Sequence, residues 1–282
     1  MPDIDVSFYR DHGYLVVPRL VTPAEVEALR ADALRICRGE YPHEKLQPMD
    51  PGLSDDDVLR NFLCIHQPHK ISPVIRDLGV RHEGVAAVLA GLIGPDVKCM
   101  QSMLFVKPPG FQGQAWHQDE IYIPTRDRSL TGGWIALDEA TVNNGCLWVL
   151  PDSHQGVLYD QRPHSNPEEF DFAAESYGFD DAAEVPVEVR PGDVVFFNGY
   201  LLHRSRRNRS AIYRRVLVNH YMNAWSTLPW QLREGESAAR GDYRDILMVH
   251  GRDPYAWKGT EDRAGVSLRT CKALDDRRAG KA

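Results

Sequence analysis

The residues with the clearest chemical meaning are His117 and Asp119, which are separated only by Gln118. Residues at positions i and i+2 of a β-strand point to the same side. On a strand, His117 and Asp119 would therefore contact one metal ion while Gln118 faces away. Two histidines and one carboxylate make the facial triad that holds Fe(II) and leaves open positions for oxygen and substrate. The pair predicts part of such a site, and the missing histidine should come from another strand, later in the chain.

His203 is the best candidate for that histidine, because it follows the apolar segment 194–197, which has the composition of a buried strand. Arg214 lies in the next strongly apolar segment. A buried arginine needs an anionic partner, since its planar fork pairs with a carboxylate. The distal carboxylate of 2-oxoglutarate would supply that partner. Taken singly, an HxD pair or a histidine also arises by chance in a chain with 11 histidines, and is then an ordinary surface or core residue.

The N-terminal region predicts a strand followed by a capped helix. Residues 14–17 form a short apolar run. Thr22 as N-cap, Pro23 in the first turn and Glu25 three residues after the cap together make a capping box. A second helix is expected at about 82–92, where an apolar segment ends at a Gly-Pro pair.

From residue 97 onward, short apolar segments alternate with turn residues, which predicts strands. These segments are 97–106, 134–137, 146–150, 185–189, 194–197 and 212–222. The pair Asn144-Gly145, between the second and third segments, favours a tight hairpin turn. Several short strands after a helical start predict a mainly β fold, a sandwich or barrel with flanking helices packed outside it.

The length and composition predict one large domain. The chain has 282 residues, of which 43% are hydrophobic, enough for a sizeable core, and no Gly/Ser/Pro-rich linker divides it. We expect this domain to span residues 1–258. Within it, the polar and acidic stretch at about 155–184 predicts a lid-like insertion. Residues 259–282 are charged and short of large apolar side chains, which predicts a poorly ordered tail.

The charge and the cysteines limit the expected partners and location. A formal net charge of -7 disfavours a protein that grips nucleic-acid phosphates. The five cysteines include no CxxC pair, which favours free thiols in a reducing compartment. The N-terminal residues do not resemble a signal peptide, and no apolar run approaches the roughly 20 residues of a membrane span. We expect a cytoplasmic protein with a small-molecule substrate, no nucleic acid and no membrane; the oligomeric state is left open.

The sequence resembles the phytanoyl-CoA dioxygenase superfamily of iron- and 2-oxoglutarate-dependent oxygenases over roughly residues 8–221. The matching motifs occur in the family's order: FYRDHGYLVV at 8–17, QSMLFVKPP at 101–109, WHQD at 116–119, GWIAL at 133–137, NGCLWVLP at 144–151, RPGD at 190–193, and a last block with His203, Ser205, Asn208, Ser210 and Arg214. One departure is Asp152, where the family usually has glycine; it affects a turn and not the chemistry.

The resemblance implies a double-stranded β-helix (jelly-roll) fold that binds Fe(II) and 2-oxoglutarate and uses O2. Position by position, it implies three catalytic iron ligands: His117, Asp119 and His203. It implies that Arg214 binds the distal carboxylate of 2-oxoglutarate and that Ser205 adds a hydrogen bond. It places three further residues in the cosubstrate pocket: Gln101, Met103 and Trp134. The spacing from His203 favours Arg214 over Arg215, since neighbours on a strand face opposite ways.

The reaction that the resemblance implies is hydroxylation of an unactivated C–H bond, with release of succinate and CO2. Relatives that halogenate have a small residue in place of the carboxylate ligand, so Asp119 favours hydroxylation or a related oxidation. The acidic insertion lacks a basic cluster for coenzyme A phosphates, so we expect a small or medium-sized neutral or cationic metabolite. Substrate contacts are expected from Gln118, Ile121, Tyr122 and residues 159–177.

Other readings stay open. One is an acyl-CoA hydroxylase of the same family, in which the basic run at 204–209 would grip phosphates instead of forming a solvated loop. A second is a cupin-like metalloprotein that is not an oxygenase, against which Arg214 argues. A third is a non-catalytic binding protein, which the intact ligand set disfavours. His66 and His69 look like metal ligands, but the family does not use them so, and contact with substrate or cosubstrate is the better expectation.

Overall fold

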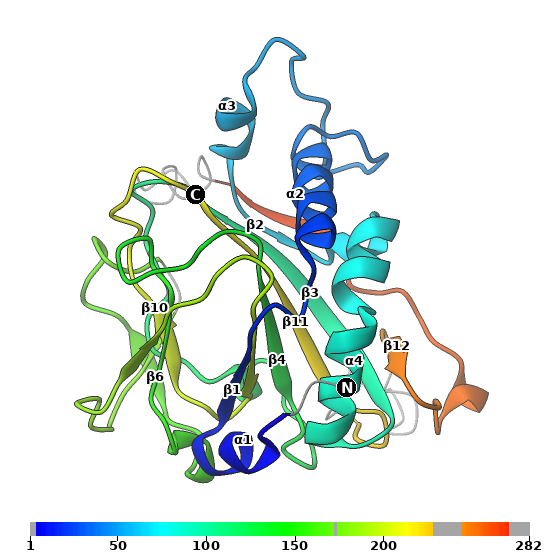
Figure 1. Cartoon of the computed structure of the whole chain (residues 1–282), viewed down its shortest axis with the longest axis vertical. Helices are drawn as coiled ribbons and strands as arrows, with labels where there is room; N and C mark the ends of the chain where they lie inside the picture. The colour runs from blue at the N-terminus through cyan, green and yellow to red at the C-terminus, as the bar shows by residue number, and fades with distance from the viewer. Residues whose placement is uncertain (1–3, 172–173, 228–243, 271–282) are drawn as a thin grey trace, which may run out of the picture.

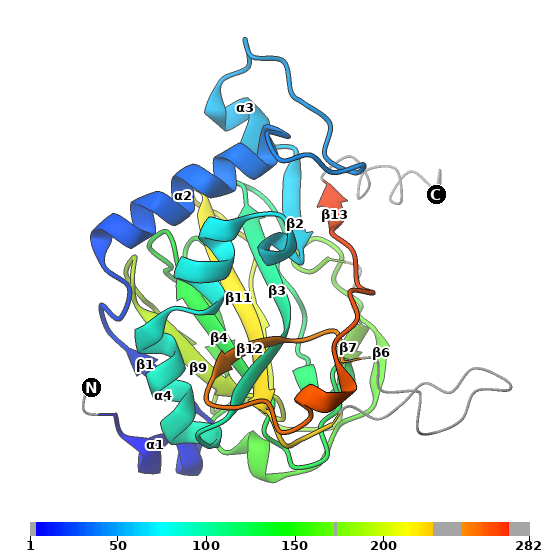
Figure 2. The ribbon, with the colours of Figure 1, turned by 90° about the vertical axis from the view of Figure 1, so that its right-hand side faces the viewer.

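Two antiparallel sheets face each other in this computed structural model, and helices cover the outer face of the larger sheet (Figures 1 and 2). The structure describes residues 4–171, 174–227 and 244–270. The arrangement is the double-stranded β-helix, or jelly roll, that the sequence predicts. Successive side chains of a strand point to opposite faces. Strands of the larger sheet therefore pack against the helices with one face and toward the smaller sheet with the other.

The larger sheet has eight strands within the described residues, in the order β1-β9-β4-β11-β3-β2-β13, with β12 paired to β3. Their bounds are β1 Tyr14–Val17, β2 Phe62–His66, β3 Val97–Lys107, β4 Thr131–Ala136, β9 Val194–Asn198, β11 Arg214–Asn223, β12 Leu247–His250 and β13 Ser267–Thr270. The long strands β3 and β11 pair along most of their length in the middle of the sheet. This long pairing fixes the relative positions of the side chains that β3 and β11 present on the inner face.

The smaller sheet has the order β10-β5-β8, and the predicted insertion carries a separate two-stranded ribbon. The bounds are β5 Leu147–Val149, β8 Val185–Val187 and β10 His203–Ser205 for the sheet, and β6 Gln161–Pro163 and β7 Ala174–Ser176 for the ribbon. His203 thus begins a strand of the smaller sheet, opposite the inner face of the larger one.

The helices confirm the two sequence predictions and add shorter ones. Their bounds are α1 Val6–His12, α2 Pro23–Cys37, α3 Asp55–Leu59 and α4 Glu83–Ile93, with short turns η1 Pro68–Lys70, η2 Ile75–Val80, η3 Asp119–Ile121, η4 Ser153–Gln155 and η6 Ala256–Lys258. At the start of α2, Thr22 Oγ1 accepts the backbone N–H of Glu25, and Glu25 accepts that of Thr22. Across the described residues, no helix combines the length and apolar character that a membrane crossing needs.

Strand β11 shows how one sheet serves two cores. Leu217 packs outward into the core formed with Leu29 of α2 and Leu89 of α4. Val216 and Val218 point the other way, into the core between the two sheets. Each fully buried side chain of this kind contributes about 1.5 to 3 kcal/mol by removal from water. The alternation fixes the register of β11, because a slip by one residue would exchange the two faces.

The four described cysteines are buried free thiols, as the sequence predicts. They are Cys37, Cys64, Cys99 and Cys146. Burial raises the pKa of the Cys37, Cys64 and Cys99 thiols to about 12. These side chains therefore stay protonated and act as small apolar core residues. Cys271 lies outside the described residues.

The hairpin predicted at Asn144-Gly145 is wrong, because the strands on either side belong to different sheets. Strand β4 pairs with β9 and β11, whereas β5 pairs with β8 and β10. The side chain of Asn144 accepts the backbone N–H of Thr141 and donates to the carbonyl of Glu139, both at 2.8 Å. These bonds build a wider turn that carries the chain from one sheet to the other, which the dipeptide alone does not reveal.

The prediction of a poorly ordered tail from residue 259 is wrong for residues 267–270. These residues form β13, which pairs antiparallel with β2 at the edge of the larger sheet. Val266, just before the strand, is 1% exposed and joins the main core. One well-placed apolar side chain thus anchors a segment whose composition is otherwise polar. Residues 271–282 lie outside the described part of the chain.

The capping box predicts a measurable stability effect. Replacing Thr22 by alanine removes the acceptor for the Glu25 N–H, and we expect a loss of about 1 kcal/mol in the free energy of unfolding, measured by urea denaturation. Thr22→Ser keeps the hydroxyl and should retain most of that stability. Equal stability of the alanine variant and the parent protein would contradict this account of the start of α2.

Candidate metal centre

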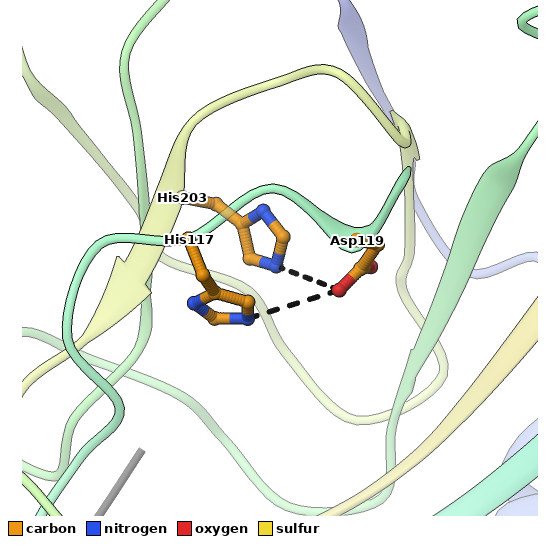
Figure 3. A group of neighbouring side chains, drawn as sticks. All are labelled: His117, Asp119 and His203. Atoms are coloured by element: carbon orange, nitrogen blue, oxygen red, sulfur yellow. Dashed lines mark ion pairs between the residues drawn. The ribbon is translucent and has the colours of Figure 1, made fainter. Parts of the chain in front are cut away.

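His117, Asp119 and His203 lie together, with their side chains pointing toward one another (Figure 3). One ligand atom from each lies within 4.8 Å of the others. The Nε2 atoms of His117 and His203 are 3.8 and 3.7 Å from Oδ1 of Asp119. This grouping of two imidazoles and one carboxylate can hold a metal ion, and its donor set suits Fe(II).

A pair of backbone hydrogen bonds brings the two histidines together. The N–H of His117 donates to the carbonyl of His203 at 3.0 Å, and the N–H of His203 donates back at 3.1 Å. The Nδ1 atoms lie 2.8 and 2.9 Å from the carbonyls of Ala115 and Leu201. Each Nδ1 therefore carries the proton and donates it, which leaves the Nε2 lone pair free for a metal.

The local structure at Asp119 differs from the predicted strand. His117 forms only an isolated bridge, and Asp119 is the first residue of the short helix η3. Gln118 between them has extended backbone angles, φ -125° and ψ 126°. One extended residue is enough to turn His117 and Asp119 to the same side, so the expected spatial relation holds without a regular strand.

Gln118 faces away from the cavity and supports the centre from behind. Its side chain donates to the carbonyls of Val157 and Tyr200 at 3.0 and 2.7 Å and accepts the N–H of Tyr159 at 2.9 Å. Gln118 therefore ties the start of the 155–184 insertion to the metal centre. The expectation that Gln118 contacts substrate is wrong, because all its hydrogen-bonding groups are used by backbone partners.

The protonation states of the three side chains suit metal binding. Burial lowers the pKa of His203 to about 4, which keeps its imidazole neutral near pH 7. Burial works against ionisation of Asp119, but the imidazoles of His220, His203 and His117 outweigh it and hold the pKa of this carboxyl well below its usual range. The centre therefore presents an anionic carboxylate beside a neutral histidine ligand.

A cavity of about 440 Å³ opens beside these three residues. Its wall includes all eight residues predicted as iron ligands or 2-oxoglutarate contacts: Gln101, Met103, His117, Asp119, Trp134, His203, Ser205 and Arg214. The strand register explains the gathering, because Met103 on β3 pairs with Val218 on β11, which pairs with Trp134 on β4. Directly paired residues share a face, so this row points into the space between the sheets.

Arg214 is a buried cation without a carboxylate partner in the described part of the chain. It is 5% exposed, its Nε has no hydrogen-bond partner there, and its guanidinium lies over the Trp134 ring at 5.5 Å. Burial lowers its pKa to about 10, so it stays charged near pH 7. Arg215 faces the other way and binds both oxygens of Asp138 at 2.8 and 2.9 Å. Arg214, and not Arg215, therefore lines the cavity.

Ser205 lies at the same end of the cavity and is held by close backbone packing. Its Oγ accepts the N–H of Gln114 at 3.2 Å and the ammonium of Lys107 at 3.3 Å, which leaves its own proton to donate. A Cβ on Gly113 would lie 1.7 Å from the Ser205 carbonyl oxygen. Glycine at position 113 is therefore required for the segment before His117 to pass against β10.

Sequence reasoning missed His220, which contacts the metal centre directly. Its Nε2 lies 2.9 Å from Oδ2 of Asp119, and its Nδ1 is buried without a partner among the described residues. Nε2 therefore carries the proton and donates to the carboxylate, leaving Oδ1 toward the two ligand histidines. Strand alternation from Arg214 puts His220 on the inner face of β11, a signal that becomes meaningful only once Asp119 is known to lie opposite.

Some of the remaining residues predicted to contact substrate or cosubstrate line the cavity, and others do not. His66 and Tyr122 line the cavity, as do Gln161 and Ala174 from the insertion. Ile121 does not line it, although its neighbour Ile123 does. His69 is occupied elsewhere, with its Nδ1 2.6 Å from the hydroxyl of Ser102. The cavity wall also contains Arg269 of β13, which sequence reasoning assigned to the tail.

The contact between His220 and Asp119 predicts an effect on metal affinity. His220→Leu removes the donor to Oδ2, and we expect the affinity for Fe(II) to fall about 10- to 100-fold in an anaerobic titration. His220→Gln offers an amide N–H at a similar reach and should restore much of the affinity. A leucine variant that binds Fe(II) as tightly as the parent protein would show that the hydrogen bond does not orient Asp119.

Two curated relatives are similar over most of this chain. Phytanoyl-CoA dioxygenase 1 of Oryza sativa subsp. japonica is 33% identical over 269 residues, which cover 83% of this chain and 95% of that protein. The peroxisomal phytanoyl-CoA dioxygenase of Bos taurus is 30% identical over 236 residues, which cover 77% of this chain and 67% of that protein. The chain thus spans about two thirds of the cattle protein.

A solved structure and a family model agree with these relatives. The non-haem α-ketoglutarate-dependent carbocyclase SnoK from nogalamycin biosynthesis aligns with a TM-score of 0.65 and 25% identity, over 86% of this chain and 94% of that one. The family model described as phytanoyl-CoA dioxygenase (PhyH) matches residues 9–216. Three quarters of the chain lie in that match, and the rice relative is covered almost completely. The chain therefore belongs to the phytanoyl-CoA dioxygenase family.

Proposed function

We propose that this protein is an Fe(II)- and 2-oxoglutarate-dependent oxygenase that hydroxylates a C–H bond of a small metabolite. The observation that carries the proposal is the pairing of a possible Fe(II) triad with a buried, unpaired guanidinium at one end of the same cavity. A buried cation of this kind calls for an anionic partner. When bound, iron and 2-oxoglutarate would supply an O2-derived oxidant for C–H bonds, with succinate and CO2 as by-products.

The iron would be held by Nε2 of His117, Nε2 of His203 and Oδ1 of Asp119. Both Nε2 lone pairs are free because each Nδ1 proton is given to a backbone carbonyl. Oδ2 of Asp119 is engaged by His220, which favours ligation through Oδ1 alone. The protein's part is to fix these three atoms and to leave the remaining coordination positions open to the cavity.

The distal carboxylate of 2-oxoglutarate would be bound by Arg214, with the hydroxyl proton of Ser205 as a second donor. The Trp134 ring lies beside Arg214, and Met103 lines the same cavity. Burial of Arg214 strengthens an ionic contact, because the local dielectric constant is low. Gln101 lies farther along the same wall, on the row that contains His220.

The reaction type is proposed from Asp119. A carboxylate at this position fills the coordination site that halogenating relatives leave for chloride, so oxygen transfer is the expected outcome. SnoK, which shares the fold, is named a carbocyclase. Hydroxylation is therefore proposed here as the simplest product of this ligand set, and ring closure or another oxidation would depend on how the substrate lies over the metal.

A small metabolite is preferred to an acyl-CoA because three of the four arginines in the basic run are already paired with carboxylates. Arg204 and Arg206 both pair with Glu184 and lie over the rings of Trp116 and Trp148. Arg209 of the same run pairs with Glu169. These arginines hold the insertion against the smaller sheet and are not grouped to receive phosphates. The cavity volume of about 440 Å³ also suits a compact substrate beside 2-oxoglutarate.

Arg214 also separates the proposal from the two readings outside the oxygenases. A cupin-like hydrolase or isomerase has no need of a buried carboxylate clamp beside its metal. A non-catalytic binding protein would share the residues but not the turnover of 2-oxoglutarate. A cytoplasmic location stays a prediction, since the cattle relative is named as peroxisomal.

The test is an anaerobic titration of the metal-free protein with Fe(II) and then 2-oxoglutarate, monitored by the weak visible charge-transfer band of the chelate. We expect the band in the parent protein and none in His117→Ala. Arg214→Ala should need about 10- to 100-fold more 2-oxoglutarate, because a charge-assisted contact is lost. Arg76→Ala, an exposed arginine paired with its neighbour Asp77, is the matched control and should behave like the parent protein.

The outcomes separate the three classes of function. A band together with succinate release in air supports the oxygenase. A band without any succinate release, over a broad range of added metabolites, favours the non-catalytic protein. Absence of the band while iron is demonstrably bound rejects the assignment of 2-oxoglutarate and favours a metalloprotein of another kind.

A further inference from the structure

Strand β13 places a further guanidinium in the wall of the cavity. Arg269 pairs with Cys64 of β2, which pairs with Phe105 of β3. Directly paired residues of antiparallel strands share a face, and Phe105 lines the cavity, so Arg269 points to the same side. Arg269 lies beyond residues 9–216, to which the family model extends.

The guanidinium of Arg269 has donors to spare. One Nη2 N–H donates to Oδ2 of Asp171, and no other hydrogen bond from this side chain is found among the described residues. A guanidinium has five N–H donors, so most remain available. The side chain is 31% exposed and lines the cavity, in contrast to Arg214, which is almost fully covered.

His66 lies beside Arg269 on the same wall. It pairs with Ser267 in β13 and with Met103 in β3, and it lines the cavity. Burial, with a smaller contribution from the charge of Arg269, lowers the pKa of His66 to about 4. Its imidazole is therefore neutral near pH 7 and carries one N–H donor. Arg269 and His66 together offer hydrogen-bond donors and positive charge at one place.

The other charged groups of the cavity wall are already assigned. Asp119 and Arg214 belong to the proposed metal and cosubstrate sites. Arg204 is paired with two carboxylates, Glu184 and Asp181, and lies over Trp116, whereas Arg269 is paired with Asp171 alone. Among the described residues of the wall, Arg269 is therefore the less compensated of these two cations and the better placed to meet a substrate.

Much of the acidity of the insertion is compensated by arginines of the protein itself. Five of the eight acidic side chains between residues 155 and 184 form such pairs: Glu169 with Arg209, Asp171 with Arg269, Glu175 with Arg162, Asp181 with Arg204, and Glu184 with Arg204 and Arg206. The sequence-based expectation of a neutral or cationic metabolite counted all of these charges as free. The ion pairs weaken that argument.

We propose that Arg269, assisted by His66, binds an anionic oxygen group of the substrate, and that the substrate is a small carboxylic acid. This inference rests on the proposed oxygenase function. Arg269 recognises the carboxylate of the compound to be oxidised, while Arg214 holds that of 2-oxoglutarate, so each carboxylate has its own guanidinium. Arg269 is a specificity-determining residue in this scheme and takes no part in the metal centre.

The experiment compares benzoate with benzamide, two probes of nearly equal shape that differ in charge. Both are titrated anaerobically into the protein loaded with Fe(II) and saturating 2-oxoglutarate, and the visible band of the chelate reports binding. Persistence of the band shows that the probe has not displaced 2-oxoglutarate from Arg214. We expect benzoate to bind about tenfold or more tightly than benzamide, as a charge-assisted contact requires.

Four variants locate that preference. Arg269→Gln should abolish the preference for benzoate, and Arg269→Lys should keep part of it, since lysine retains the charge but not the fork. Asp171→Asn breaks the ion pair but keeps Arg269, so the preference should survive; this separates binding from anchoring of the insertion. Arg162→Gln, which removes an exposed ion pair of the insertion outside the cavity, is the control.

The failure modes are distinguishable. If no chelate band forms, the proposed function fails before the inference is reached. If the band forms and benzoate binds no better than benzamide, including the case in which neither binds at millimolar concentration, the carboxylate subsite is rejected. A preference that persists in Arg269→Gln assigns the anion to another residue and overturns the role of Arg269. Loss of the preference in Asp171→Asn as well as in Arg269→Gln would mean that the ion pair only holds the insertion in place. Arg269 would then not bind the carboxylate itself, and the proposal would be overturned.

Discussion

The reciprocal backbone hydrogen bonds between His117 and His203 are the constraint on which the site depends. They lock two distant segments in one register, so that both imidazoles leave the bridge toward the same point. The extended backbone of Gln118 then delivers Asp119 to that point, and the missing side chain of Gly113 lets the approaching chain lie against β10. The proposed metal ligands are thus positioned by main-chain contacts to the smaller sheet, while the larger sheet opposite supplies much of the cavity wall.

Sequence reasoning succeeded where a local rule was sufficient. The spacing of His117 and Asp119 needs one extended residue. Strand alternation allows only one of Arg214 and Arg215 to enter the cavity, and the spacing from His203 favours Arg214. It failed where the outcome depends on a distant contact. The turn at Asn144 is decided by which sheet receives β5, and the order of residues 267–270 depends on the fit of Val266 into a core built by the first half of the chain. Sequence reasoning missed His220 for the same reason, since its role depends on a contact with Asp119 that is known only from the fold.

The distribution of free charges in the fold differs from the one that the sequence indicates. The acidic insertion and the basic run at 204–209 look like two separate features when read along the chain. In the fold, three arginines of the run pair with acidic residues of the insertion, and two of these arginines also lie over tryptophan rings. Partly exposed pairs of this kind contribute little stability singly, but together they fix where the insertion lies. Composition gives the number of charged side chains. Substrate selectivity depends on which of these side chains are not fully compensated by ion pairs within the protein.

Strand β13 occupies the outermost position of the larger sheet, with β2 as its single neighbour on that path. An edge strand interrupts fewer hydrogen bonds when its sequence changes than a strand between two others. The residues proposed for the metal and for 2-oxoglutarate sit on the bridge to β10 and on the central strand β11, where a change would disturb several neighbours at once. The fold thus separates the two proposed functions: a substitution at the rim of the sheet can alter the substrate wall with little disturbance of the groups proposed to bind the metal and 2-oxoglutarate.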